Sequence, residues 1–217
     1  MFKYFLYLFF ISISFRSFSQ DTLITLPKFD TVPRWRLSSN LRIDFSQVYL
    51  ENWVAGGQSA YSASGNFDGI LNYKNINHQW ESRIELAYGF LNNRIDGFMK
   101  TDDKINFLSN YSYKAFNSFN YSFLTSFRTQ FYPGFNYPNR EIAISNFMAP
   151  AYIIASAGMN YKRDKLLTIN LAPLAARFTI VNDPTLSQEG AFGVEPGRNV
   201  REEFGSYFKG TYRRENI

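Results

Sequence analysis

Residues 117–132 read NSFNYSFLTSFRTQFY, and this stretch indicates the fold class of the chain. The odd positions from 119 to 131 are Phe, Tyr, Phe, Thr, Phe, Thr and Phe, whereas the even positions from 118 to 130 are Ser, Asn, Ser, Leu, Ser, Arg and Gln. A period of two puts these two sets on opposite faces of a β-strand. A helix would turn Tyr121 away from Phe119, and Ser, Asn, Thr and Phe are poor helix formers. The pattern therefore predicts a long strand with one apolar and one polar face.

The composition of the whole chain fits many strands of this kind. Aromatic residues make up 19% of the 217 residues, yet the mean hydropathy is −0.27. Beyond the N-terminus, no apolar run is long enough for a transmembrane helix. A transmembrane β-barrel reconciles these facts, because every second residue of each strand can be polar and face the interior.

Cysteine usage and charge exclude several classes of function. The chain has no cysteine, which excludes a disulfide framework, a thiolate metal site and a lipidated cysteine. His78 is the only histidine, so a histidine-based metal site is not expected. The net charge of +5 arises without a dense run of Lys or Arg, which argues against a nucleic-acid partner. No feature of the sequence predicts a cofactor.

The N-terminus has the features of a secretory signal. Lys3 precedes an apolar segment at residues 4–15, and Ser17-Phe18-Ser19 forms a small-x-small cleavage site. An uncleaved anchor helix is the alternative, but the apolar segment is short and interrupted by serines. The predicted organisation is a signal peptide at residues 1–19, an exported N-terminal tail at 20–33 and a β-barrel domain at 34–217.

Eight segments are predicted as strands from their alternation and from the turn-forming residues that separate them. Pro173 lies inside the seventh segment and predicts a bulge or a change of phase there, because proline cannot donate to a sheet ladder. The predicted strands are residues 35–45, 60–73, 78–91, 104–113, 117–132, 147–161, 166–181 and 200–212.

The connections between these strands alternate in length. Short turns are predicted at residues 74–77, 114–116 and 162–165, and long connections at 46–59, 92–103, 133–146 and 182–199. Outer-membrane barrels combine short periplasmic turns with long external loops. The last long loop is rich in Gly and Pro and is expected to be flexible.

The predicted fold class is therefore all-β, an antiparallel up-and-down transmembrane β-barrel with eight strands visible. A complete barrel pairs its last strand with its first and leaves no open edge in lipid. The chain stops soon after the last predicted strand, at Ile217, whereas barrels commonly end on an aromatic residue. Eight strands could close into a barrel, but we expect this barrel to be incomplete, with its C-terminal hairpins missing.

The polar faces of the predicted strands hold the candidate functional residues. As the lining of a pore, their mixed charges would tune the passage of a solute. As a structural network, they would fill a narrow barrel with ion pairs and need no substrate. Both interpretations require inward side chains, so truncating Arg128 is expected to alter conductance or stability and truncating Thr129 to alter neither. The lumen-lining candidates are Arg42, Asp44, Asp68, Glu81, Arg83, Glu85, Arg128, Arg201 and Glu203.

The most distinctive connection contains the loop motif Asn52, Trp53, Gly56 and Gly57. Paired glycines permit positive φ angles or close approach of another chain, and tryptophan offers an amphipathic ring. One interpretation is a loop that constricts the barrel mouth or binds a partner. The other is a tight loop that places Trp53 at the membrane interface.

A single pair of residues could supply a hydrolytic site. Ser82 shares a strand face with His78, four residues along, and a serine nucleophile needs such a base. No G-x-S-x-G elbow is present, and His78 adjoins a predicted turn. We therefore predict no enzymatic activity and no catalytic residue.

Three blocks of sequence resemble a known family. They read NWVAGGQSAYSASGNFDGILNY at 52–73, INLAPLAARFTIVND at 169–183 and REEFGSYFKGTYRRE at 201–215. Together they are similar to a domain-of-unknown-function family of exported Gram-negative bacterial proteins with outer-membrane-type β-barrels. The resemblance runs from Trp35 to the end of the chain; it implies export, a barrel and further strands beyond residue 217, and it implies no activity. The matching positions are Asn52, Trp53, Gly56, Gly57, Pro173, Phe204 and Gly205.

The predicted function is that of an outer-membrane β-barrel protein, either a small pore or a structural or assembly component. The expected location is the cell outer membrane, reached through a cleaved signal peptide. The expected partners are outer-membrane lipid and, during insertion, the barrel-assembly machinery. The alternative is a soluble periplasmic β-barrel or sandwich whose aromatic faces line a core or a cavity for a hydrophobic ligand.

Overall fold

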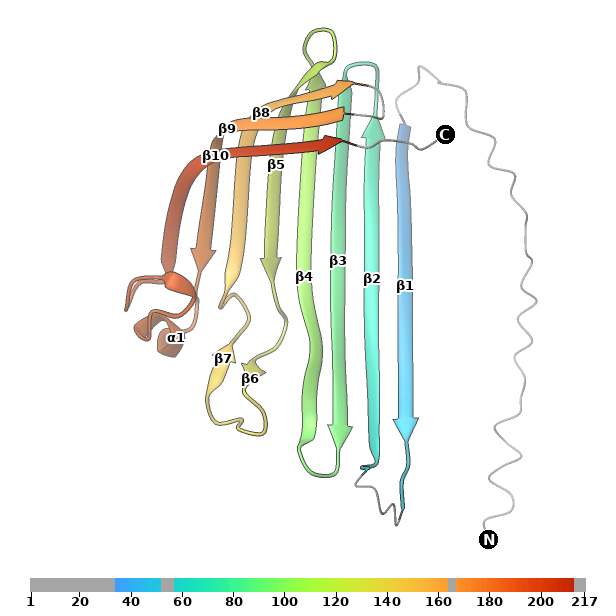
Figure 1. The fold of residues 1–217 in the computed structure, drawn as a ribbon, viewed down its shortest axis with the longest axis vertical. Helices are drawn as coiled ribbons and strands as arrows, with labels where there is room; N and C mark the ends of the chain where they lie inside the picture. The colour runs from blue at the N-terminus through green and yellow to red at the C-terminus, as the bar shows by residue number, and fades with distance from the viewer. Residues whose placement is uncertain (1–33, 52–56, 164–166, 213–217) are drawn as a thin grey trace, which may run out of the picture. The chain divides into compact units, whose positions relative to one another are not determined.

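The computed structural model describes residues 34–51, 57–163 and 167–212, so the predicted signal peptide and exported tail lie outside the described residues. The described chain is all-β, with an eight-stranded antiparallel sheet in the order β1-β2-β3-β4-β5-β8-β9-β10 (Figure 1). A two-stranded sheet, β6-β7, and two short helices lie in the connections. The elements are β1 Arg34–Val48, β2 Ala60–Lys74, β3 His78–Asn93, β4 Gly97–Lys114, β5 Phe119–Thr129, β6 Gly134–Phe135, β7 Ala143–Ser145, β8 Ala151–Arg163, β9 Leu167–Ile180, α1 Pro184–Gln188, η1 Ala191–Gly193 and β10 Val200–Tyr212.

The predicted strands are all present, but the prediction of a long connection at residues 92–103 is wrong. β3 continues to Asn93 and β4 begins at Gly97, so a tight turn joins them. The Asn93 side-chain oxygen accepts hydrogen bonds from the backbone N–H groups of Ile95 and Asp96, at 3.1 and 2.6 Å. This Asx turn is a local device that the alternation pattern does not show. Long and short connections therefore do not alternate strictly.

The antiparallel order places the long connections at a single end of the sheet. We call this the loop end; it carries the connections 49–59, 130–150 and 181–199 together with the tight turn 94–96. The opposite end, which we call the turn end, carries the turns 75–77 and 115–118.

The register defines two chemically different faces, because paired residues on neighbouring strands point to the same side. One row reads Leu41, Phe67, Leu86 and Ile105, and the adjacent row reads Asn40, Asp68, Glu85 and Asn106. We call these sides the apolar face and the polar face. The apolar face is largely uncovered: Leu37 and Phe204 are each 75% exposed.

Little of the described chain forms a conventional hydrophobic core. The main cluster of buried apolar side chains lies at the loop end and consists of Ala149, Val181, Leu186 and Val194. β1 and β10 are the two edges of the sheet, and neither pairs with a second long strand among the described residues. The sheet is therefore held mainly by its ladder and by cross-strand side-chain pairs.

The irregularity predicted at Pro173 is confirmed. The register shifts between Ala157 and Met159 on β8 and between Gly205 and Tyr207 on β10, and both shifts lie opposite this proline. β9 thus holds one extra residue, and Leu171 and Leu174 both lie on the apolar face although they are three residues apart. Bulges bend strands, and β8, β9 and β10 bend sharply in Figure 1, whereas β1, β2 and β3 run nearly straight.

Candidate functional site

The register brings all of the lumen-lining candidates to the polar face. The central row runs Asn40, Asp68, Glu85, Asn106, Arg128, Tyr152, Thr179 and Arg201 across the whole sheet. The remaining candidates occupy the same face in neighbouring rows and are Arg42, Asp44, Glu81, Arg83 and Glu203.

On the β1–β4 side, the charged groups are paired locally. Glu85 accepts hydrogen bonds from Lys104 at 3.2 Å and from the Asn106 amide at 3.1 Å. Arg42 lies 3.1 Å from Asp44 on its own strand. These side chains are partly exposed, so each pair contributes little to stability. The sequence prediction omitted Lys104, which it placed at a strand boundary.

On the β5–β10 side, arginines outnumber carboxylates. We call Arg128, Arg177 and Arg201 the arginine cluster. Glu203 lies 2.9 Å from Arg201 and 3.8 Å from Arg177, and the Arg177 guanidinium lies 5.1 Å from the Tyr152 ring centre. Among the described residues, none forms a hydrogen bond or an ion pair with the Arg128 side chain. Sequence reasoning missed Arg177 because the bulge at Pro173 obscured the phase of its strand.

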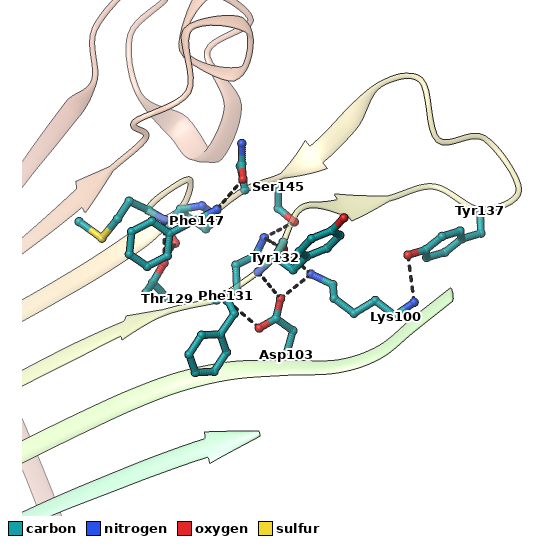
Figure 2. Close-up of polar contacts among 12 residues, drawn as sticks. Lys100, Asp103, Thr129, Phe131, Tyr132, Tyr137, Ser145 and Phe147 are labelled. Carbon is teal, nitrogen blue, oxygen red and sulfur yellow. Dashed lines mark hydrogen bonds and ion pairs between the residues drawn. The ribbon is translucent and has the colours of Figure 1, made fainter. Parts of the chain in front are cut away.

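The second candidate region is the loop platform, which we define as residues 130–150 and 181–199. Its first half is fastened to β4 through Asp103, as Figure 2 shows. Asp103 forms an ion pair with Lys100 at 2.8 Å. It also accepts hydrogen bonds from the backbone N–H groups of Phe131 and Tyr132, at 2.7 and 2.9 Å. The Tyr137 hydroxyl accepts a hydrogen bond from the Lys100 backbone N–H at 2.9 Å. The Asp103 and Lys100 side chains are only 3% and 12% exposed.

The two halves of the loop platform are joined to each other. The Asn146 amide donates to Asp183 at 3.1 Å, and the Asn182 N–H donates to the Met148 carbonyl at 2.9 Å. The buried cluster of Ala149, Val181, Leu186 and Val194 lies between them. Residues 182–199, which are expected to be flexible from their composition, thus contain helix α1 and long-range contacts that the composition does not show.

The structure also changes the expectation for Thr129. This residue belongs to the apolar face by register, but it is only 5% exposed because the loop platform covers it. Its hydroxyl donates to the Pro150 carbonyl and accepts from the Met148 N–H, both at 3.1 Å (Figure 2). Truncation of Thr129 is therefore expected to destabilise the loop platform rather than to be silent.

Asp183 caps helix α1 and supplies a local test of the loop platform. Its pKa is held below the ordinary aspartate value, first by the Asn146 amide and then by the N–H groups of Leu186 and Thr185. Because the folded pKa is the lower one, this stabilisation is present above about pH 4 and is lost as the pH falls through the lowered pKa. Asp183→Ala should cost about 1 kcal/mol of local stability, measured by amide hydrogen exchange of residues 185–188 at neutral pH. Glu189→Ala is the control; equal exchange in the two variants would contradict the capping role.

The loop motif lies largely outside the described residues. Asn52, Trp53 and Gly56 fall in the segment 52–56, whereas Gly57 is described and exposed. The base of this connection is closed by Ser59, whose hydroxyl accepts from the Leu50 N–H at 2.9 Å and donates to the Leu50 carbonyl at 3.0 Å.

His78 and Ser82 share the apolar face, as expected, but their contacts lie elsewhere. His78 Nδ1 lies 2.7 Å from the Tyr111 hydroxyl, and the Ser82 hydroxyl lies 2.9 Å from that of Ser109. Within the described residues, no group of three or more metal-ligating side chains is arranged to hold a metal ion. Among the described residues, the charged side chains of the polar face are therefore the best candidate for a functional site.

Taken together, the fold and the site define an all-β protein built on one two-faced antiparallel sheet. Residues 45–135 match the model of a family described as protein of unknown function (DUF3078). The matched range extends from the end of β1 through β6 and supports a domain-of-unknown-function family. No curated protein and no solved structure matches the chain. No helix in the described ranges has the length and apolar character needed to cross a membrane.

Proposed function

We propose that this chain forms the wall of an outer-membrane β-barrel, with the apolar face toward lipid and the polar face toward an aqueous interior. The observation that carries this proposal is an uncovered apolar face bounded by aromatic residues at both ends. Exposed apolar surface of this extent is rare in soluble monomers. In an outer-membrane barrel such a surface faces lipid, so it is not exposed to water.

One aromatic row crosses the apolar face near the turn end. Trp35 packs against Tyr73 and Trp80, with ring centres 4.8 and 5.8 Å apart. The Trp80 indole N–H donates to Ser109 at 2.8 Å, so its polar atom is satisfied. Tryptophan and tyrosine are enriched at membrane–water interfaces. The row consists of Trp35, Tyr73, Trp80, Tyr111 and Phe123.

A second aromatic group marks the loop end of the same face. Phe90 stacks on Phe98 at 4.9 Å and contacts Tyr61 at 6.4 Å, and Phe45 lies in the same row as Phe90. From Trp35 to Phe45 is about ten residues, or about 33 Å of extended strand. At a tilt of about 40° this length spans about 25 Å, the height of the apolar band in outer-membrane barrels.

An apolar hollow on the same sheet favours the second candidate, a binder of hydrophobic ligands. The hollow has a volume of about 490 Å³ and lies beside the bulge on β9. In a membrane a lipid chain would fill it, whereas in a soluble protein it would receive a ligand. Its lining includes Tyr111, Tyr121, Phe123, Met159, Leu171 and Pro173.

Adjacent cysteine substitutions test the two candidates, and the cysteine-free chain makes each label unique. Leu41→Cys and Arg42→Cys place a fluorescent probe on the apolar and the polar face of β1. With the full-length product in vesicles carrying nitroxide-labelled acyl chains, we expect strong quenching at position 41 and little at position 42. Equal quenching at both positions, or failure of the protein to float with the vesicles, would contradict the proposal and favour the soluble binder.

A further inference from the structure

The charges on the polar face are not distributed evenly. The central part of β2 and β3 carries Asp68, Glu81 and Glu85, with Arg83 as their basic neighbour. The sequences of β5, β8 and β9 contain no acidic residue. Glu203 is therefore the one carboxylate that faces the arginine cluster from the described strands β5 to β10, since the neighbouring Glu202 shares a register position with Phe178 on the apolar face.

The arginine cluster spans four neighbouring strands of the polar face, from β5 to β10. Arg128 pairs with Tyr152, which pairs with Thr179, which pairs with Arg201, so these residues form one row across four strands. Arg177 lies in the next row of this face, directly opposite Glu203. Strands are about 4.8 Å apart, so Arg128 lies about 14 Å across the sheet from Arg201. Arg177 and Arg201 meet at Glu203, and Arg128 faces the same side of the sheet from β5.

The charge balance of this region is incomplete. Glu203 contacts both Arg201 and Arg177, so one carboxylate is shared between two cations. Arg128 has no carboxylate partner among the described residues. The Arg177 and Arg201 side chains are 51% and 47% exposed, so a solute can reach them.

We propose that the arginine cluster binds a small, water-soluble oxyanion, a solute bearing a phosphate or carboxylate group. Guanidinium groups recognise such groups through paired N–H donors, and Glu203 occupies part of the site much as a ligand carboxylate would. Tyr152 holds the Arg177 guanidinium over its ring and offers a hydroxyl within the same region. A soluble ligand is assigned because the cluster lies on the face opposite the exposed apolar side chains.

This inference names the solute class for the proposed barrel interior, and its placement there depends on the proposed function. Binding itself is measured in detergent micelles, where no membrane insertion is needed. Failure of the binding experiment would overturn this inference alone, whereas failure of the quenching experiment would overturn the proposed function.

The experiment is titration calorimetry of the full-length protein with inorganic pyrophosphate at low ionic strength. Arg128→Ala should weaken binding about tenfold, the loss of roughly one charge-assisted contact. Glu203→Gln should tighten binding, because it removes the competing carboxylate. Arg36→Ala is the matched control, an exposed arginine on the same face of the distant strand β1, and it should bind like the wild type.

Three results would overturn the inference. They are absence of wild-type binding, equal weakening by Arg36→Ala and Arg128→Ala, and unchanged or weaker binding by Glu203→Gln with the sheet content intact by circular dichroism. In a second arm, vesicles of anionic phospholipid and free inorganic phosphate each compete with pyrophosphate for the protein, at equal phosphate concentration. Stronger competition by the vesicles than by free phosphate would assign the site to lipid headgroups and contradict a soluble ligand.

Discussion

Replacing Asp103 with alanine is expected to release the first half of the loop platform from the sheet. The variant leaves the largely buried Lys100 ammonium without its carboxylate, with only the Tyr132 carbonyl still accepting from it at 2.7 Å. It also leaves the backbone N–H groups of Phe131 and Tyr132 without their acceptor. Breaking a buried charge pair by removing one partner costs about 3–5 kcal/mol. Hydrogen exchange should accelerate strongly across residues 130–150, while the ladders of β1, β2 and β3 keep their protection.

The neighbouring residue supplies the control for this prediction. Asp102 has the same charge and the same local sequence, but it is exposed and lies opposite Gly89 on the polar face. Asp102→Ala should leave exchange of residues 130–150 unchanged. Comparable exchange in the two variants would show that the loop platform is held by other contacts, such as the Gln130 amide, which donates to Ser145 at 2.8 Å.

The strands could be predicted from the sequence because their signal is local. An alternation such as that of residues 117–132 is complete within one strand and needs no knowledge of its neighbours. The same holds for Pro173, whose missing N–H restricts its place in a ladder wherever the strand lies. The same alternation predicts which charged residues share a face of each strand, and the register places these residues on one face of the sheet.

The loop platform could not be predicted because its contacts join distant parts of the chain. Asp103 and the Phe131 N–H are 28 residues apart, and Asn146 and Asp183 are 37 apart. One usable signal was present nevertheless. Asp103 lies two residues before Ile105, so the alternation of the strand places it on the apolar face. An acidic side chain that is buried there needs a partner. The predicted strand begins at residue 104, so Asp103 falls in the predicted connection.

The Asn93 turn and the bulge on β4 explain the remaining boundary error. Gly89 pairs with Asp102 and Phe90 with Lys100, so Thr101 is an extra residue on β4. The bulge reverses the alternation beyond it, which makes residues 97–103 look irregular in sequence although they belong to the strand. A bulge can therefore make the end of a strand unrecognisable in the sequence pattern. Here the bulge also places Lys100 on the same face as Asp103 and within reach of it.

Gly158→Ala is expected to have the other large effect, on the sheet itself. A Cβ atom at this position would collide with the backbone of β9, at the Leu171 carbonyl oxygen and the Ala172 Cα atom. Backbone atoms inside a ladder cannot move aside as a flexible side chain can, so the pairing of β8 with β9 has to open. We expect a loss of about 3 kcal/mol or more in the free energy of unfolding, measured by urea titration of the detergent-folded protein.

Two further variants show whether the bulge causes this sensitivity. Gly205→Ala changes the strand on the other side of the bulge, where no atom lies within 4 Å of the added Cβ, and it should be close to neutral. Deleting Pro173 removes the extra residue and makes β9 pair regularly with both β8 and β10, because Leu171 and Leu174 then keep the apolar face without a shift. The deletion should therefore recover much of the stability lost in Gly158→Ala. If the double variant is no more stable than Gly158→Ala, the collision does not depend on the bulge, and the requirement for glycine at position 158 has another origin.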